Sequence, residues 1–136
     1  MPALPKTADT PVLRTDFSDQ TAWEALLTAI ATPDEDEFMA YVEYVEDPAY
    51  RDLTSEQALA LVPEEFGHPI LIVADRAALA SPEMPLLVID LREERGREIR
   101  VAVENLWSIE NNLSISNMDF VEFARAVDED GVFRGF

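Results

Sequence analysis

Apolar side chains recur at helical intervals in several stretches of the chain. Between residues 20 and 31 they stand three and four positions apart, which places them on one face of a helix. Ser18 or Asp19 can cap that helix, because their side-chain oxygens accept hydrogen bonds from unpaired first-turn N–H groups. Thr54 and Gln57 have the spacing of a capping box, which marks another helix start. Further helices are predicted at residues 54–62, 106–113 and 120–127.

Other stretches are typical of β-strands. Two apolar runs lack polar positions altogether, as expected of central strands that are covered on both faces. The segment between these two runs is short for a parallel crossover, so their relative direction stays open. Polar residues with a glycine at 92–96 predict a hairpin turn. The predicted strands are residues 12–17, 38–46, 70–74, 86–89 and 99–103.

This order of elements predicts an α+β fold in a single domain. We expect a mixed sheet of about five strands with three to four helices packed on it, formed by residues 11–136 after a loose N-terminal arm at residues 1–10. The apolar tail at residues 132–136 is expected to dock on the core through Phe133 and Phe136. The residues predicted to share one core are Trp23, Leu26, Ile30, Ile72, Val88, Ile89 and Phe123.

The composition is strongly acidic, since 28 Asp and Glu residues face 10 Lys and Arg residues, for a net charge of −18. Such a field repels nucleic acid and anionic membranes and attracts basic proteins. We therefore expect a basic protein as partner, with no direct nucleic-acid binding and no membrane association. The acidity can instead serve solubility alone, or it can be a halophilic adaptation, since Lys6 is the only lysine beside nine arginines.

Few residues are suited to catalysis or metal binding. The chain has no cysteine and a single histidine, His68, which stands in a Gly-His-Pro turn. Thiolate chemistry is excluded, and one histidine cannot supply a zinc or iron site. Residues 128–131 superficially resemble a calcium loop, but the glycine comes too early and the final acid is missing. We expect no cofactor and no metal, and although enzymatic activity is not excluded, a non-enzymatic role is favoured.

The N-terminal residues contain no apolar run of signal-peptide length. No stretch approaches the roughly 20 apolar residues that a membrane-spanning helix needs. We therefore expect a cytoplasmic protein.

The stretch from residue 107 to residue 119 gathers amides and carboxylates beside a tryptophan. Aromatic anchors dominate interface energies, so this stretch is a candidate for partner or ligand binding. The alternative is that these polar residues only stabilise helix ends, with Asn117 capping the last helix. Capping explains the residue types without a ligand and is the favoured interpretation. The candidate residues are Trp107, Glu110, Asn111, Asn112, Asn117 and Asp119.

Four segments carry a family resemblance: residues 14–19, 110–115, 117–120 and 131–136. Together they resemble an uncharacterised bacterial domain family found largely in actinobacteria, and the resemblance covers nearly the whole chain. That family has no assigned activity, so the resemblance implies no catalytic residues. It implies a GC-rich genome, rather than halophily, as the cause of the lysine shortage. The second and third segments also loosely resemble the tails of small acidic toxin-immunity domains.

Three hypotheses for function follow from these observations. The first is a non-enzymatic protein-binding module, for example an inhibitor or immunity-type protein that acts on a basic partner by electrostatic steering and aromatic docking. The second is a small-ligand binder or enzyme with a carboxylate and asparagine pocket near residues 111–119. The third is a nucleic-acid mimic. A deep pocket at those residues would favour the second hypothesis, and a flat carboxylate-rich face the first and third. The oligomeric state stays open.

Overall fold

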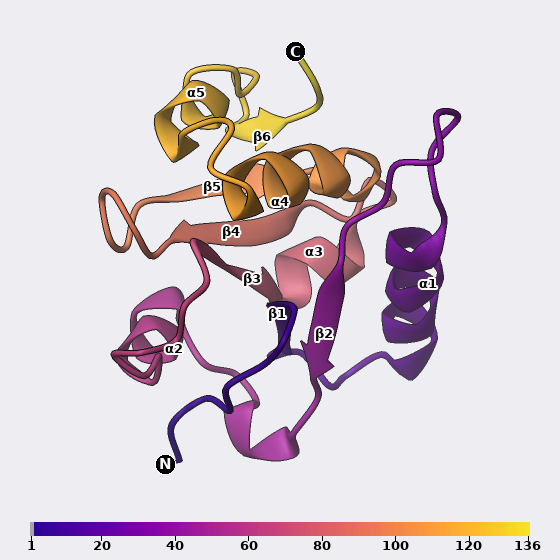
Figure 1. The fold of residues 1–136 in the computed structure, drawn as a ribbon. Helices are drawn as coiled ribbons and strands as arrows, with labels where there is room; N and C mark the ends of the chain where they lie inside the picture. The colour runs from indigo at the N-terminus through magenta and orange to yellow at the C-terminus, as the bar shows by residue number, and fades with distance from the viewer. Residues whose placement is uncertain (1) are drawn as a thin grey trace.

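The computed structural model describes residues 2–136, which form a six-stranded mixed sheet with five α-helices (Figure 1). This arrangement confirms the α+β class predicted from the sequence. The strands are β1 (Thr10–Arg14), β2 (Val42–Val45), β3 (Ile70–Ala74), β4 (Leu86–Asp90), β5 (Glu98–Val101) and β6 (Val132–Phe133). The helices are α1 (Gln20–Ala31), α2 (Ser55–Ala60), α3 (Arg76–Ala80), α4 (Leu106–Ser114) and α5 (Phe120–Ala124), with 3-10 turns η1 (Pro48–Tyr50) and η2 (Val103–Asn105).

The sheet combines a parallel half with an antiparallel half. Its strand order is β2-β1-β3-β4-β5-β6, in which β1 pairs parallel to both β2 and β3. β4 runs antiparallel to β3, with Ile72 opposite Val88, which settles the direction that the sequence left open. β4 and β5 are antiparallel on either side of the predicted turn, and β6 adds parallel to β5.

Each face of the sheet is covered by its own core. Alternate residues of β3 and β4 point to opposite faces, as the two-residue repeat of a strand requires. On one face, α1, α3, α4 and α5 cover Ile72 and Val88. On the other, α2 and its neighbouring loops cover Leu71 and Ile89. All seven residues predicted as core are buried, but the expectation of one shared core is wrong for Ile89, because it points to the second face.

The N-terminal segment makes specific contacts with the second core. Of the expected loose arm at residues 1–10, Met1 lies outside the described residues. The Leu4 side chain is buried, and its backbone N–H donates to the Leu61 carbonyl at 2.8 Å. The Tyr50 hydroxyl donates to the Ala3 carbonyl at 2.9 Å, and β1 already begins at Thr10.

Helix starts largely follow the predicted caps. Asp19 Oδ1 accepts from Ala22 N–H at 3.0 Å at the start of α1, and Thr54 and Gln57 form the complete capping box of α2. The last helix differs from its prediction, since α5 is capped by Asp119 rather than Asn117. Its first turn is closed by Glu122, which accepts from the Asp119 N–H at 2.8 Å.

The two phenylalanines of the C-terminal tail contact the core to different extents. Phe133 is fully buried in β6, directly after Gly131, whose φ of +82° is one that glycine adopts readily. Phe136 remains 74% exposed, although its ring centroid lies 5.0 Å from that of Phe133. Both rings therefore contact the core, since the Phe136 ring also lies 5.1 Å from that of Phe123, but only Phe133 is buried in it.

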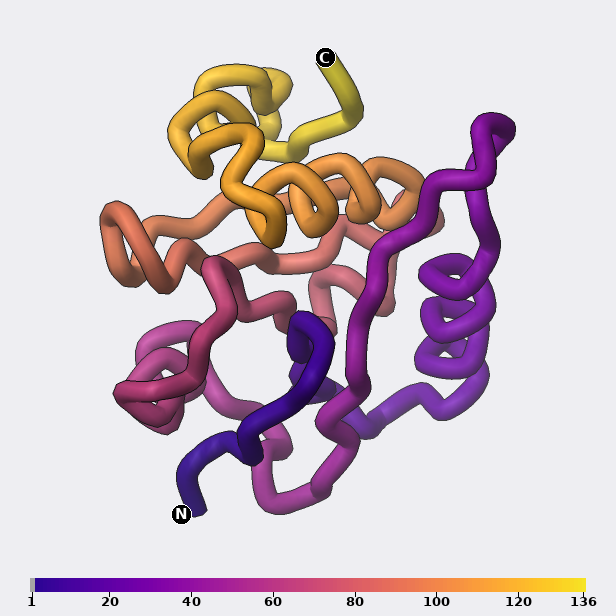
Figure 2. The backbone as a smooth tube through the Cα atoms, in the orientation of Figure 1, coloured from indigo at the N-terminus to yellow at the C-terminus, as the bar shows by residue number. Residues whose placement is uncertain are grey.

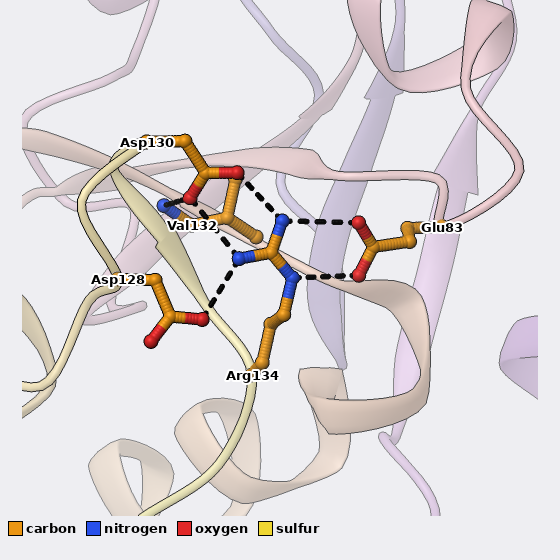
Figure 3. Close-up of polar contacts among 5 residues, drawn as sticks. All are labelled: Glu83, Asp128, Asp130, Val132 and Arg134. Atoms are coloured by element: carbon orange, nitrogen blue, oxygen red, sulfur yellow. Dashed lines mark hydrogen bonds and ion pairs between the residues drawn. The ribbon is translucent and has the colours of Figure 1, made fainter.

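An arginine clamp holds this tail against the loop that precedes β4 (Figure 3). Arg134 Nε and Nη2 donate to the two carboxylate oxygens of Glu83 at 2.7 and 3.0 Å. Nη1 donates to Asp128 at 2.8 Å, and Nη2 donates to Asp130 at 2.6 Å. The hydrogen bonds from Arg134 hold the pKa of Glu83 and that of Asp130 below their ordinary values.

The clamp predicts an acid-dependent contribution to stability. Carboxyl pKa values that are lowered by folding stabilise the fold above the unfolded-state values near pH 4, and this contribution is lost as the pH falls through the folded-state values. We expect Arg134→Met to lower the melting temperature at neutral pH, and this effect to shrink between pH 7 and pH 2 as the pH falls through the lowered pKa values of Glu83 and Asp130. Thermal unfolding across this pH range measures the difference. An equal effect of Arg134→Met at both ends of the range would contradict an electrostatic role.

Candidate functional site

The loop between α1 and β2 projects from the body of the molecule (Figure 2). Asp34 shapes its tip, because one carboxylate oxygen accepts from the N–H groups of Asp36 and Phe38, both at 2.9 Å. Glu37 adopts a φ of +66° in the same turn. The side chains of Glu35 and Asp36 therefore stand exposed at the tip, while Asp34 is occupied in holding the turn.

Three residues singled out in the sequence fasten this loop to α4. Tyr41 N–H donates to Glu110 Oε1 at 2.7 Å, and Asn111 Nδ2 donates to the Met39 carbonyl at 3.1 Å. The Trp107 ring stacks on Phe38 with centroids 4.7 Å apart and planes 12° from parallel. Because residues 38–41 make these contacts with α4 instead of pairing with β1, β2 begins at Val42 rather than at the predicted residue 38.

Glu110 is the central polar group of this attachment. Its side chain is only 3% exposed, and its carboxylate accepts from four donors of the protein. A buried carboxylate is tolerated when its oxygens are hydrogen-bonded in this way. The donors are Thr10 Oγ1 at 3.0 Å, Tyr41 N at 2.7 Å, Asn111 Nδ2 at 3.0 Å and Ser114 Oγ at 2.6 Å.

An acidic cleft of about 650 Å³ lies between this loop, the end of α1 and the start of α4. Its floor is apolar and includes Ile30, Ala40 and Leu106. Within residues 2–136, none of the side chains lining the cleft is basic. The carboxylates that line it are Asp34, Glu35, Asp36 and Glu104.

Aromatic and polar groups complete the cleft wall. Phe38 is 46% exposed on the outer side of its stack with Trp107, and both residues line the cleft. Asn105 lines it as well, and its buried Oδ1 accepts no hydrogen bond from the described residues. Buried acceptors without a donor are rare in folded proteins. The cleft therefore combines negative charge with an exposed aromatic ring, whereas Asn105 Oδ1 lies beneath the surface of its wall.

The three remaining candidate residues lie in the last turn of α4 and in the connection from α4 to α5. Asn112 Nδ2 donates to the Ser108 carbonyl at 2.8 Å, and Asn117 Nδ2 donates to Asn112 Oδ1 at 2.9 Å. With Asp119 at the start of α5, these contacts stabilise helix ends. The structure thus separates the six candidates into a loop attachment and a helix-end group, and only Trp107 lines the acidic cleft.

From the sequence, residues 34–37 could be named as one acidic run of a recognition face, with Glu43, Glu46 or Glu64 and Glu65 as example partners, but their meeting with Glu104 was missed. Residues 34–37 have the pattern of an ordinary solvated acidic run. Glu104 lies about 70 residues further along the chain and shares no motif with the loop. Only the packing of the loop on α4 brings these carboxylates to one cleft, so no spacing in the sequence indicates it.

A second hollow of about 480 Å³ is lined in part by Tyr41. His68 and Ile115 line it together with Glu110 and Asn111. His68 Nε2 lies 2.9 Å from the Thr7 carbonyl oxygen, within hydrogen-bond distance. Because the Glu110 oxygens are occupied by four donors of the protein, this hollow presents no free carboxylate from that residue.

Across residues 2–136, no three His, Asp or Glu side chains converge closely enough to hold a metal ion. No helix there combines the length and apolar composition needed to cross a bilayer.

Comparison with known proteins places nearly the whole chain in one family. Residues 9–136 match a family described as a domain of unknown function (DUF6924). No curated protein matches the sequence.

Proposed function

The chain belongs to the DUF6924 family, and we propose that it is a non-enzymatic protein-binding module that takes a basic segment of a partner protein into the acidic cleft. The observation that carries this proposal is the lining of the cleft, where four carboxylates surround an apolar floor and no basic side chain from residues 2–136 takes part. An inhibitor or immunity-type protein for a basic enzyme is one biological form of this activity.

The chemistry of the cleft suits arginine in particular. A guanidinium group is planar, so it can stack on an aromatic face while its N–H groups pair with carboxylates. The cleft offers both features, with Phe38 exposed beside Glu35 and Asp36. The net charge of −18 would also steer a basic partner toward the protein and raise the association rate.

The shape of the site favours this function over the two alternatives. A nucleic-acid mimic needs carboxylates in an open row that imitates phosphate spacing, whereas these carboxylates surround a hollow with an apolar floor. In the second hollow the Glu110 oxygens are already occupied, and the lining places Arg92 beside Asp9, so its charge is not of one sign. The acidic cleft is therefore the stronger candidate for recognition.

A short synthetic peptide tests the proposal. The probe is a fluorescent peptide of nine residues that alternates arginine with leucine, and its control carries glutamine in place of arginine. We expect binding of the arginine peptide only, measured by fluorescence anisotropy. The affinity should fall steeply between about 0.05 M and about 0.5 M salt, where the Debye length shrinks to about 4 Å.

Two matched variants separate the cleft from the overall charge. Three charge reversals in the cleft should weaken binding about 30-fold, because reversals of roughly 0.7 kcal/mol each sum to about 2 kcal/mol. The same number of reversals elsewhere should change the affinity less than about threefold, although the net charge changes equally. An equal loss of peptide affinity in both variants would show that binding depends only on the net charge, and it would contradict the proposal. The cleft variant carries Glu35→Lys, Asp36→Lys and Glu104→Lys, and the control carries Glu64→Lys, Glu98→Lys and Glu129→Lys.

A further inference from the structure

The two edges of the sheet are treated differently. At β6 the chain blocks its own edge, because Val132 N–H donates to Asp130 Oδ1 at 3.2 Å and the Val132 carbonyl accepts from Asp128 N–H at 2.9 Å. At the opposite edge, β2 pairs with β1 on one side, and no other strand within residues 2–136 pairs with its second side. Free strand edges are ready templates for another strand.

β2 has some of the features that protect a free edge and lacks others. Natural edge strands are often blunted by proline, by charged side chains such as lysine, by a bulge or by being very short. The four residues of β2, Val42–Val45, contain neither proline nor lysine, and they pair with β1 in an uninterrupted register. The charged side chain in the strand is Glu43, which is exposed and negative. A strand that adds here would therefore meet an acidic edge.

The free edge of β2 continues into the acidic cleft. Phe38, Met39 and Ala40 line the cleft, and the chain enters β2 two residues later. Between them stands Tyr41, which is 63% exposed. The four residues of β2 span about 13 Å, and residues 38–40, which line the cleft, precede the strand in the chain without belonging to it. One extended segment can thus contact both the cleft and the edge.

We propose that the basic segment binds in extended form as an additional strand on the free edge of β2, with its arginine side chains directed to the cleft and to Glu43. This inference rests on the proposed function and specifies the conformation of the ligand. Backbone hydrogen bonds along β2 supply affinity without regard to sequence, and the carboxylates supply the preference for arginine. The protein would then recognise unfolded or extended basic segments rather than basic helices.

Backbone methylation of the same nine-residue peptide tests this geometry. Successive N–H groups of a strand point to opposite sides, so only one alternate set of peptide amides can face β2. We expect N-methylation of that set to weaken binding by about 30-fold or more, since two or more backbone hydrogen bonds are lost. N-methylation of the other set should change the affinity less than about threefold, because those amides face solvent. Saturation with the unmethylated peptide should also slow hydrogen exchange of amides in Val42–Val45.

The outcomes separate strand addition on β2 from binding in the acidic cleft. A loss of affinity in only one of the two N-methylated peptides, together with slower hydrogen exchange in β2, supports strand addition. If both N-methylated peptides keep their affinity, or both lose it equally, strand addition is overturned and the acidic cleft remains as the binding site. Failure of the unmethylated arginine peptide to bind overturns both the proposed function and this inference.

Discussion

Replacing Glu110 with alanine is expected to lower the free energy of unfolding by about 3 kcal/mol, because four hydrogen-bond donors lose a charged acceptor at once. The donors come from β1, from the segment before β2 and from α4 itself, so one side chain joins parts of the chain up to 100 residues apart. Urea unfolding monitored by circular dichroism measures the loss. Glu104→Ala is the control, since that exposed glutamate should change stability by less than about 0.5 kcal/mol.

Glu110→Gln should retain most of this stability, with a loss of about 1 kcal/mol. Oε2 accepts from the Thr10 and Ser114 hydroxyls, and both hydroxyls can rotate to accept from a glutamine amide placed there. Oε1 would remain an acceptor for Tyr41 N–H and Asn111 Nδ2. Glutamine that is as damaging as alanine would show that the negative charge itself is needed. An alanine variant as stable as the native protein would contradict the attachment role.

The helices, the central strands and the fold class were predictable because, in those segments, the spacing of apolar residues matches the faces that are buried. The apolar run at β3 is buried on both faces, and the spacing in α1 matches the face that packs on the sheet. The two-residue strand β6 was missed because its pairing with β5 depends on a distant segment rather than on a local pattern. The start of β2 at Val42, rather than at residue 38, was missed for the same reason. Glu110 of α4 accepts from the backbone of Tyr41, and Asn111 donates to that of Met39.

The candidate site was predictable only in part. Composition around Trp107 drew attention to α4, and three of its residues do hold the loop that forms the acidic cleft. The helix-end role of Asn112 and Asp119 follows from general capping preferences. The cleft itself depends on the meeting of residues 34–36 with Glu104, and charge runs carry no information about which other carboxylates they approach in space.

Buried Arg14 is a second feature that composition does not reveal. It is 2% exposed at the end of β1, and its guanidinium carbon lies 4.3 Å from the Phe17 ring centroid and 4.8 Å from that of Trp23. Arg14 Nε donates to the Asp16 carbonyl at 2.8 Å, and Nη1 donates to Gln20 at 3.1 Å. Its ion pair with Glu46 is longer, at 3.5 Å, and the Glu46 side chain is half-exposed.

These contacts decide which interaction dominates at Arg14. An ion pair with a half-exposed partner contributes about 1 kcal/mol at most, because solvent screens it. Stacking between two rings, the packed stem and two charge-assisted hydrogen bonds together contribute more. We therefore expect Arg14→Ala to lower the free energy of unfolding by about 3 to 4 kcal/mol.

Arg14→Lys separates charge from shape. Lysine keeps the positive charge and can still pair with Glu46, but it lacks the planar fork that stacks on aromatic rings and donates from several nitrogens. We expect this variant to lose about 2 kcal/mol, whereas Arg125→Lys, at an exposed arginine, should change stability by less than about 0.5 kcal/mol. Urea unfolding of the three variants measures these values. If Arg14→Lys were as stable as the native protein, the ion pair with Glu46, rather than the stacked guanidinium, would be what joins β1 to α1 and β2.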